Sequence, residues 1–133
     1  MLVSPQDISP SQDFLKQGTV NFIFTCIKNN ELDKLPPAPI VRRDAQGQLV
    51  AIDGHNLIAV KHFLGEDIEV HIAESADDRI MGNTKAYNLR NHELKDKFEK
   101  VLIDRVEVYA RGIKTFNDLI SLHKDIFRNI RRN

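Results

Sequence analysis

The sequence predicts an α+β fold, in which a small mixed β-sheet with a strand-turn-helix motif of the phosphate-binding type precedes a helical C-terminal half. Three observations lead to this prediction. Two segments that resemble strands, Ile40–Arg43 and Gln48–Ile52, flank the turn sequence Asp44-Ala45-Gln46-Gly47 as in a β-hairpin. The second run leads at once into a segment with helical spacing. From Tyr87 onward, the apolar residues recur mainly at helical spacing.

The size and composition of the chain fit one globular domain. It has 133 residues, of which 41% are hydrophobic and 29% are charged. Such a chain can bury one modest core and is not typical of disordered proteins. We expect residues 1–82 to form an α/β core and residues 83–133 to form a helical extension of the same domain.

The charge balance and the cysteine count exclude several classes of function. Lys+Arg and Asp+Glu both number 19, so net charge favours neither a nucleic-acid nor a membrane partner. No apolar run approaches the roughly 20 residues that span a bilayer, and the first residues lack the pattern of a signal peptide. The single cysteine, Cys26, excludes an intrachain disulfide. We therefore expect a cytoplasmic protein without a membrane partner.

The first half of the chain supplies the sheet and two helices. Residues 1–13 predict a short strand and a turn, and a helix over residues 20–27 follows. The segment Leu35–Pro39 ends this helical region, because proline removes backbone donors and restricts the residue before it. After the hairpin we expect a helix over residues 57–64, closed by a glycine, and then a half-buried strand over residues 68–72.

The second half predicts helices. A long helical pattern runs from Tyr87 to Arg111 and ends at Gly112. Thr115 can cap the last helix, with Asp118 three residues further on. The apolar face of this last helix comprises Phe116, Leu119, Ile120, His123, Phe127 and Ile130.

The turn Asp53-Gly54-His55-Asn56 lies where a strand passes directly into a helix. The first turn of a helix has free N–H groups and the positive end of the helix dipole, which together bind anions such as phosphate. Gly54 lacks a Cβ, so a ligand can approach the backbone, and His55 and Asn56 are expected to project at the helix entrance. The alternative is structural: Asp53 caps the helix and Gly54 only forms a tight turn.

The stretch PPAPIVRRDAQGQLVAIDGHNLIAVKHFLGEDIEVHIAE resembles the ParB/sulfiredoxin-like superfamily. In that superfamily, a proline-led strand and a hairpin lead to a strand that ends in a glycine-containing motif, and a helix and an alternating strand follow. The corresponding elements here are Ile40–Arg43, Gln48–Asp53, Leu57–Gly65 and Ile68–Ile72. The resemblance covers about residues 2–110.

The resemblance implies that the turn binds a nucleotide phosphate, with ATP or CTP and Mg²⁺ as the cofactor. ParB proteins carry Gly-Glu-Arg-Arg at this place and bind CTP, whereas free-serine kinases carry Asp-Gly-His-His-Arg. Asp53, Gly54 and His55 match the second form, while Asn56 replaces its second histidine and Leu57 replaces its arginine. Sulfiredoxins use a cysteine where His55 stands, so their reaction is not expected here.

Two further segments carry candidate residues by the same resemblance. Tyr87-Asn88-Leu89-Arg90 is similar to a second phosphate-contacting motif of ParB proteins, which assigns Asn88 and Arg90 to nucleotide binding. Glu31 lies where kinase-like relatives carry a general base. The structural alternative for Tyr87–Arg90 is the first turn of a polar helix, and for Glu31 it is a solvated loop. The five histidines lack the spacing of a metal site, so no protein-held metal is expected.

Two functions from different classes follow. In the first, the chain binds a nucleotide or another phosphorylated small molecule and, if catalytic, performs phosphoryl transfer or phosphodiester hydrolysis. The candidate catalytic residues are Asp53, His55 and Glu31, and the candidate nucleotide-binding residues are Gly54, His55, Asn56, Leu57, Asn88 and Arg90. In the second, loss of the arginine has left a non-catalytic module that binds a protein, DNA or a second copy through Tyr87–Asn133.

Overall fold

Strand β4 lies at the centre of the fold and positions the candidate site. A computed structural model describes residues 1–78, 91–128 and 130. β4 pairs in parallel with β2 and antiparallel with β3, within a four-stranded sheet of order β2-β4-β3-β6. β1 and β5 form a separate antiparallel pair. The strands are β1 (Leu2–Val3), β2 (Ile8–Ser9), β3 (Ile40–Arg43), β4 (Leu49–Asp53), β5 (Ile68–Glu69) and β6 (His71–Ile72).

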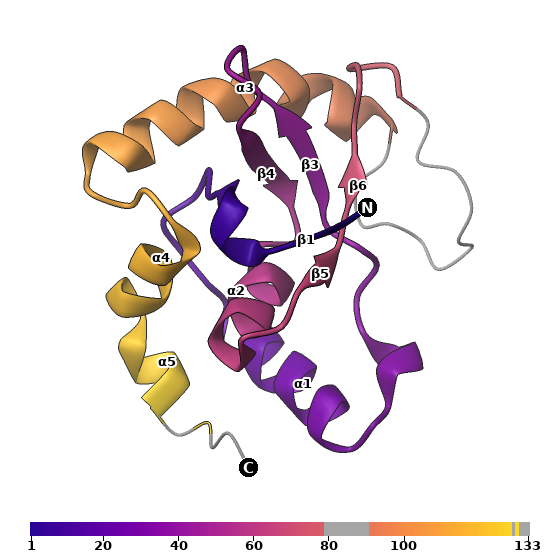
Figure 1. Ribbon diagram of the computed structural model, residues 1–133, viewed down its shortest axis with the longest axis vertical. Helices are drawn as coiled ribbons and strands as arrows, with labels where there is room; N and C mark the ends of the chain where they lie inside the picture. Colours follow the sequence, from indigo (N-terminus) through magenta and orange to yellow (C-terminus); the bar gives the residue numbers. More distant parts are fainter. Residues whose placement is uncertain (79–90, 129, 131–133) are drawn as a thin grey trace.

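Helices cover both faces of this mixed sheet, which confirms the predicted α+β class. Figure 1 shows α3 running across the strands on one side of the molecule, with α1 and α2 on the other side. The α-helices are α1 (Gln17–Lys28), α2 (His55–Leu64), α3 (Asn91–Ala110), α4 (Phe116–Leu122) and α5 (Lys124–Arg128). Two short 3₁₀ helices, Pro5–Asp7 and Leu32–Lys34, flank α1 at some distance along the chain. No helix within the described ranges is both long and apolar enough to cross a membrane.

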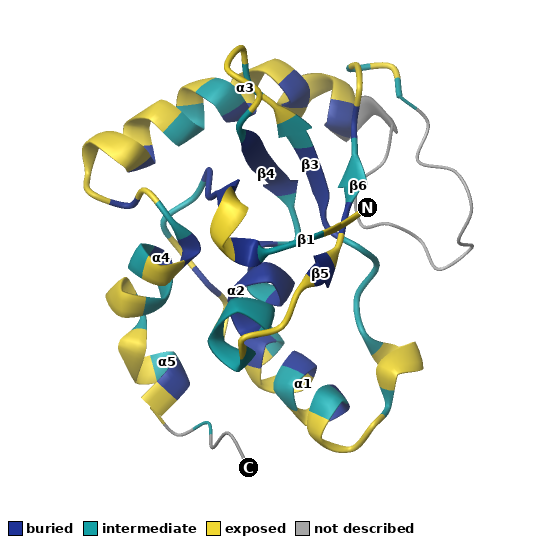
Figure 2. Cartoon of the chain, in the orientation of Figure 1, coloured by how far each residue is buried: buried dark blue, intermediate teal, exposed yellow. Residues whose placement is uncertain are grey.

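The alternation of β4 builds two cores. Leu49 and Ala51 point into a large cluster that also contains residues of α1, α2, α4 and α5. Val50 and Ile52 point the other way, into a smaller cluster with Leu94, Phe98 and Val101 of α3. A strand buried on both faces reads as a continuous apolar run, which is why Leu49–Ile52 contains no polar residue. Figure 2 shows β3 and β4 largely buried between the helices.

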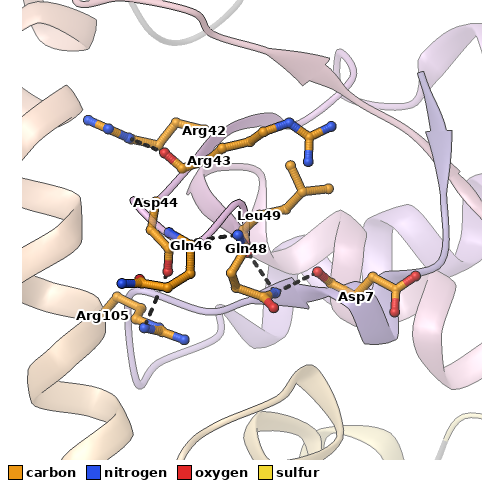
Figure 3. Close-up of polar contacts among 8 residues, drawn as sticks. All are labelled: Asp7, Arg42, Arg43, Asp44, Gln46, Gln48, Leu49 and Arg105. Atoms are coloured by element: carbon orange, nitrogen blue, oxygen red, sulfur yellow. Dashed lines mark hydrogen bonds and ion pairs between the residues drawn. The ribbon is translucent and has the colours of Figure 1, made fainter.

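The predicted hairpin between β3 and β4 is present and is fastened to α3. Asp44 Oδ1 accepts hydrogen bonds of 2.9 Å from the backbone N–H groups of Gln46 and Gln48. Its other oxygen, Oδ2, lies 3.6 Å from Arg105 Nη1 of α3, as the surroundings in Figure 3 illustrate. The Asp44 side chain thus closes the turn and also joins it to the helix that covers the sheet.

The predicted strand over residues 68–72 is a single extended run shared between two sheets. Its first half, β5, pairs with β1, and the N–H of Val70 still bonds to the Met1 carbonyl at 2.9 Å. The next N–H, of His71, bonds to the Pro39 carbonyl at 2.9 Å, and β6 then pairs in parallel with β3. Because successive N–H groups of a strand point to opposite edges, this run holds a different partner on each side.

Within the described residues, the helical half differs from its prediction at one point, while the predicted start of the long helix at Tyr87 lies outside them. α3 ends before Gly112, which has a φ of 92°, and the Thr115–Asp118 capping box at the start of α4 is present, as predicted. The last helix, however, is broken at His123 into α4 and α5. His123 Nε2 lies 2.7 Å from the carbonyl oxygen of Asp13, so a contact from a distant segment accompanies the break.

Candidate functional site

The turn between β4 and α2 depends on Gly54 for reasons of packing. Gly54 adopts a left-handed conformation, with φ of 91° and ψ of 23°, at the N-cap position of α2. A Cβ added here would lie 2.7 Å from Cβ and 2.9 Å from Cα of Pro39. The missing Cβ therefore makes room for Pro39 of the neighbouring segment, rather than primarily for a ligand as the sequence suggested.

His55 does not project at the helix entrance, and this corrects the sequence-based expectation. Its side chain is only 3% exposed, and its ring lies 5.6 Å from the ring of Phe116. The backbone N–H of Ser11 donates a hydrogen bond of 3.0 Å to His55 Nε2. The Ser11 hydroxyl donates to the Ala51 carbonyl at 2.6 Å. His55 therefore fastens the segment after β2 to the core, and it is not placed to act on a ligand in solvent.

The surroundings of His55 also fix its protonation state. Burial, together with the nearby positive charge of Lys97, lowers the pKa of His55 from 6.5 to about 3. The ring is therefore neutral near pH 7. Because Nε2 accepts the hydrogen bond from Ser11, the ring proton is on Nδ1. A neutral, buried imidazole with its acceptor occupied is unsuited to contact a phosphate.

Asn56 joins the beginning of α2 to the beginning of α1. Its Oδ1 accepts a hydrogen bond of 2.9 Å from the backbone N–H of Lys16, the N-cap residue of α1. The bond spans 40 residues of sequence and brings the positive ends of two helices together. The Asn56 side-chain N–H₂ donors have no hydrogen-bond partner among the described residues.

A cavity of about 280 Å³ lies at this junction of α1 and α2. We call it the α1–α2 cavity. It has an apolar side, formed by the proline-rich segment and an isoleucine, and a polar side, formed by the two helix ends. Its lining residues are Lys16, Thr19, Ile23, Pro36, Pro37, Ala38, Asp53, Gly54, Asn56 and Leu57.

The polar side of the α1–α2 cavity offers both positive charge and unused backbone donors. The Lys16 side chain is exposed and forms no ion pair among the described residues. α2 has no side-chain cap, and its first helical hydrogen bond runs from Ile58 N to Gly54 O at 3.1 Å. The N–H groups of residues 55–57 are therefore not used within the helix. No described group bonds to the Asp53 carboxylate, so the alternative that Asp53 caps α2 finds no hydrogen bond to support it.

Of the remaining sequence-based candidates, only Leu57 and Asp53 line the cavity. Leu57 is 6% exposed, and its side chain belongs to the large core, so it can offer a ligand little beyond its backbone. Glu31 does not line the cavity: it follows the C-terminal end of α1 and forms an ion pair with Lys34. α1 has 12 residues, or about 18 Å of helix, between that end and Lys16. Asn88 and Arg90 lie outside the described residues.

The sequence did not point to Lys16, Thr19 or the proline segment as parts of a site. Lys16 itself occupies the N-cap position of α1, where Ser, Thr, Asp or Asn is usual, and this was the local signal available. Its proximity to Asn56 is a tertiary contact that spacing along the chain cannot reveal. Cys26 is a free cysteine on α1 and is only 3% exposed.

A second cavity, also of about 280 Å³, separates α3 from residues 11–14. Its charged groups are largely neutralised by one another. Arg111 Nη1 lies 2.6 Å from Asp13 Oδ2, and Lys100 Nζ lies 3.8 Å from Asp104 Oδ2. It also contains no helix N-terminus. The α1–α2 cavity is therefore the better candidate for binding an anion. Across the described part of the chain, no group of three or more His, Cys, Asp or Glu side chains is placed to hold a metal ion.

Comparison of the chain with protein-family models, curated proteins and solved structures finds no match. The likeness to the ParB/sulfiredoxin-like superfamily therefore rests on the sequence motif around Gly54. The function has to be argued from the geometry of the site.

Proposed function

We propose that the α1–α2 cavity binds a phosphate group of a nucleotide or of another phosphorylated small molecule. The observation that carries the proposal is the meeting of two helix N-termini at one cavity, with the uncapped N–H groups of α2 and the unpaired Lys16 on the same side. Backbone N–H groups at the positive end of a helix dipole are a general means of binding phosphate.

The residues present can take the parts of a phosphate site. Lys16 supplies the positive charge that the resemblance would place on an arginine at position 57. The N–H groups of residues 55–57 and the Asn56 amide supply hydrogen-bond donors. Ile23, Pro36 and Pro37 form an apolar wall against which a base or sugar can pack.

Asp53 gives the proposed site its Mg²⁺ dependence. Its carboxylate lines the cavity beside the proposed phosphate position, where on its own it would repel an anion. A Mg²⁺ ion held mainly by phosphate oxygens and water would turn this repulsion into attraction. If turnover accompanies binding, Asp53 is the carboxylate within the cavity that can accept a proton from the attacking group.

Thermal unfolding with inorganic phosphate, ATP, ADP, CTP and GTP, each with Mg²⁺, tests the proposal. A ligand at 100 times its dissociation constant stabilises a protein by about 2.7 kcal/mol. We expect at least one of these ligands to raise the unfolding temperature, and Lys16→Ala to weaken its binding about tenfold, or about 1.4 kcal/mol.

The matched control for Lys16→Ala is Lys28→Ala. Both residues are exposed lysines on or beside α1, at its opposite ends. Equal losses of affinity in the two variants would place the ligand elsewhere, and no shift with any ligand would overturn the proposal. Asp53→Ala should weaken binding in the presence of Mg²⁺ and strengthen it when Mg²⁺ is chelated, because the carboxylate then only repels the phosphate.

A further inference from the structure

The segment that carries Lys16 to the α1–α2 cavity is held by side chains rather than by secondary structure. Residues 11–16 lie between β2 and α1, and no backbone-to-backbone hydrogen bond between described residues involves residues 12–15. We call residues 11–16 the Lys16 segment. Because it belongs to no helix or sheet, its path depends on the groups that bond to it from other elements.

Two consecutive residues of α2 hold the ends of the Lys16 segment. His55 Nε2 accepts a hydrogen bond of 3.0 Å from the N–H of Ser11, and Asn56 Oδ1 accepts one of 2.9 Å from the N–H of Lys16. Between these ends, Leu15 is 8% exposed and belongs to the large core. The start of α2 therefore fixes both ends of the segment, and Asn56 does so beside the cavity.

The helical half of the chain holds the middle of the Lys16 segment. The Asp13 carboxylate lies 2.6 Å from Nη1 of Arg111, in the turn after α3. The Asp13 carbonyl oxygen, which can only accept, lies 2.7 Å from His123 Nε2, so the imidazole N–H donates to it. His123 stands at the break between α4 and α5, which the sequence did not predict. At this break the helical half thus supplies a donor to the segment.

We propose that Asp13, Arg111 and His123 are positioning residues of the phosphate site, acting through the Lys16 segment. None of the three lines the α1–α2 cavity, so they are not placed to contact its ligand. They hold Lys16 where its charge meets the phosphate, which lowers the entropy lost on ordering the segment when the ligand binds. The inference rests on the proposed function, because it concerns the affinity of the same site.

Two variants of His123 test the proposal. His123→Leu removes the donor to the Asp13 carbonyl, whereas His123→Gln keeps an N–H donor, and neither new side chain is charged. In titrations of the folded protein with inorganic phosphate and Mg²⁺, we expect His123→Leu to bind about threefold more weakly than His123→Gln. The matched control is Leu122→Gln, a change at a neighbouring side chain that is 57% exposed, and it should leave the affinity unchanged.

Reversal of the Asp13–Arg111 ion pair separates positioning from a direct effect of charge. Asp13→Arg and Arg111→Asp should each weaken phosphate binding about threefold, because each places like charges side by side, and the double variant should restore it. A direct effect of charge on the anion would instead make Asp13→Arg bind more tightly. That result would overturn the proposal, as would a lower unfolding temperature of His123→Leu with unchanged affinity.

Hydrogen exchange at the Lys16 amide tests the inference without a ligand. Its N–H is bonded to Asn56 Oδ1, and it should exchange about threefold faster in His123→Leu than in His123→Gln. Equal exchange in the two variants would overturn the positioning role even if the wild-type protein binds phosphate. Absence of phosphate binding by the wild type would overturn the proposed function, whereas faster exchange would still support the hold of His123 on the segment.

Discussion

The N-termini of α2 and α4 differ in whether side chains bond to the free backbone N–H groups of the first turn. At α4, Thr115 and Asp118 satisfy each other's backbone N–H groups in a capping box. Hydrogen bonds from the backbone N–H of Lys114 and, to a smaller extent, from that of Thr115 lower the pKa of the Asp118 carboxyl. At α2 the cap residue is Gly54, which has no side chain, and the helix begins at a cavity. A helix end completed by its own side chains needs no ligand, whereas the end of α2 has donors left over.

The largest difference in stability should appear when alanine replaces Gly54, at the start of α2, or Gly112, in the turn that leads to α4. Gly54 and Gly112 have φ values of 91° and 92°, so the strain of a left-handed alanine is the same at both. Only Gly54 has a neighbour, Pro39, within 3.0 Å of the added Cβ. Gly112→Ala should cost about 1 kcal/mol and Gly54→Ala about 3 kcal/mol, because overpacking adds to the strain. Denaturant unfolding measures both, and equal costs would refute the role of Pro39.

Acid should lower the unfolding free energy through His55, the first residue of α2. Its folded pKa of about 3 lies below the unfolded value of 6.5, so the unfolded state binds more protons between these values. The contribution of neutral His55 is complete above pH 6.5 and is lost as the pH falls, by about 1.4 kcal/mol per unit. From pH 6 to pH 4.5 we expect a loss of about 2 kcal/mol from this residue.

Two measurements isolate His55 from the carboxylates that titrate in the same range. The slope of unfolding free energy against pH should be smaller in His55→Gln than in the wild type by about one proton. Independently of any variant, the ring carbons of His55 in the folded protein should show no NMR titration between pH 8 and pH 5. A titration near pH 6.5 would show that the ring is accessible to protons.

A smaller effect is expected from the completed cap of α4. Thr115→Ala removes the hydroxyl that accepts from the Asp118 N–H at 3.2 Å, and it should cost about 1 kcal/mol of unfolding free energy. Ser121→Ala, an exposed change later in the same helix, should cost less than about 0.5 kcal/mol. Similar costs for the two variants would mean that the Thr115–Asp118 capping box contributes little to the unfolding free energy.

The smallest effect should come from Asp53. Because its carboxylate caps nothing in the described structure, Asp53→Ala should change the unfolding free energy by less than about 0.5 kcal/mol. A loss near that of Thr115→Ala would show that Asp53 caps α2 in solution, and the two helix ends would then be alike. The same unfolding assay decides between these outcomes.

Local signals in the sequence were sufficient to predict helix ends, because these depend on neighbouring residues. Gly65 and Gly112 end their helices in left-handed conformations, and Thr115 begins one, as their positions predicted. His55 shows the limit of such signals. Its polarity and its place at a helix start predicted exposure, but its partner Ser11 lies 44 residues away in the sequence. The residues flanking the turn were found from the motif, whereas Lys16 and the proline wall required the fold.

In the extended run over residues 68–72, two adjacent backbone amides report on the opening of two different sheets. The Val70 N–H is bonded to the carbonyl of Met1, just before β1, and the His71 N–H to the carbonyl of Pro39, just before β3, so each is protected from exchange by a different sheet. Opening of the short β1–β5 pair would release the first amide and leave the second protected. Hydrogen exchange at two consecutive residues can therefore distinguish fraying of the chain's beginning from opening of the central sheet.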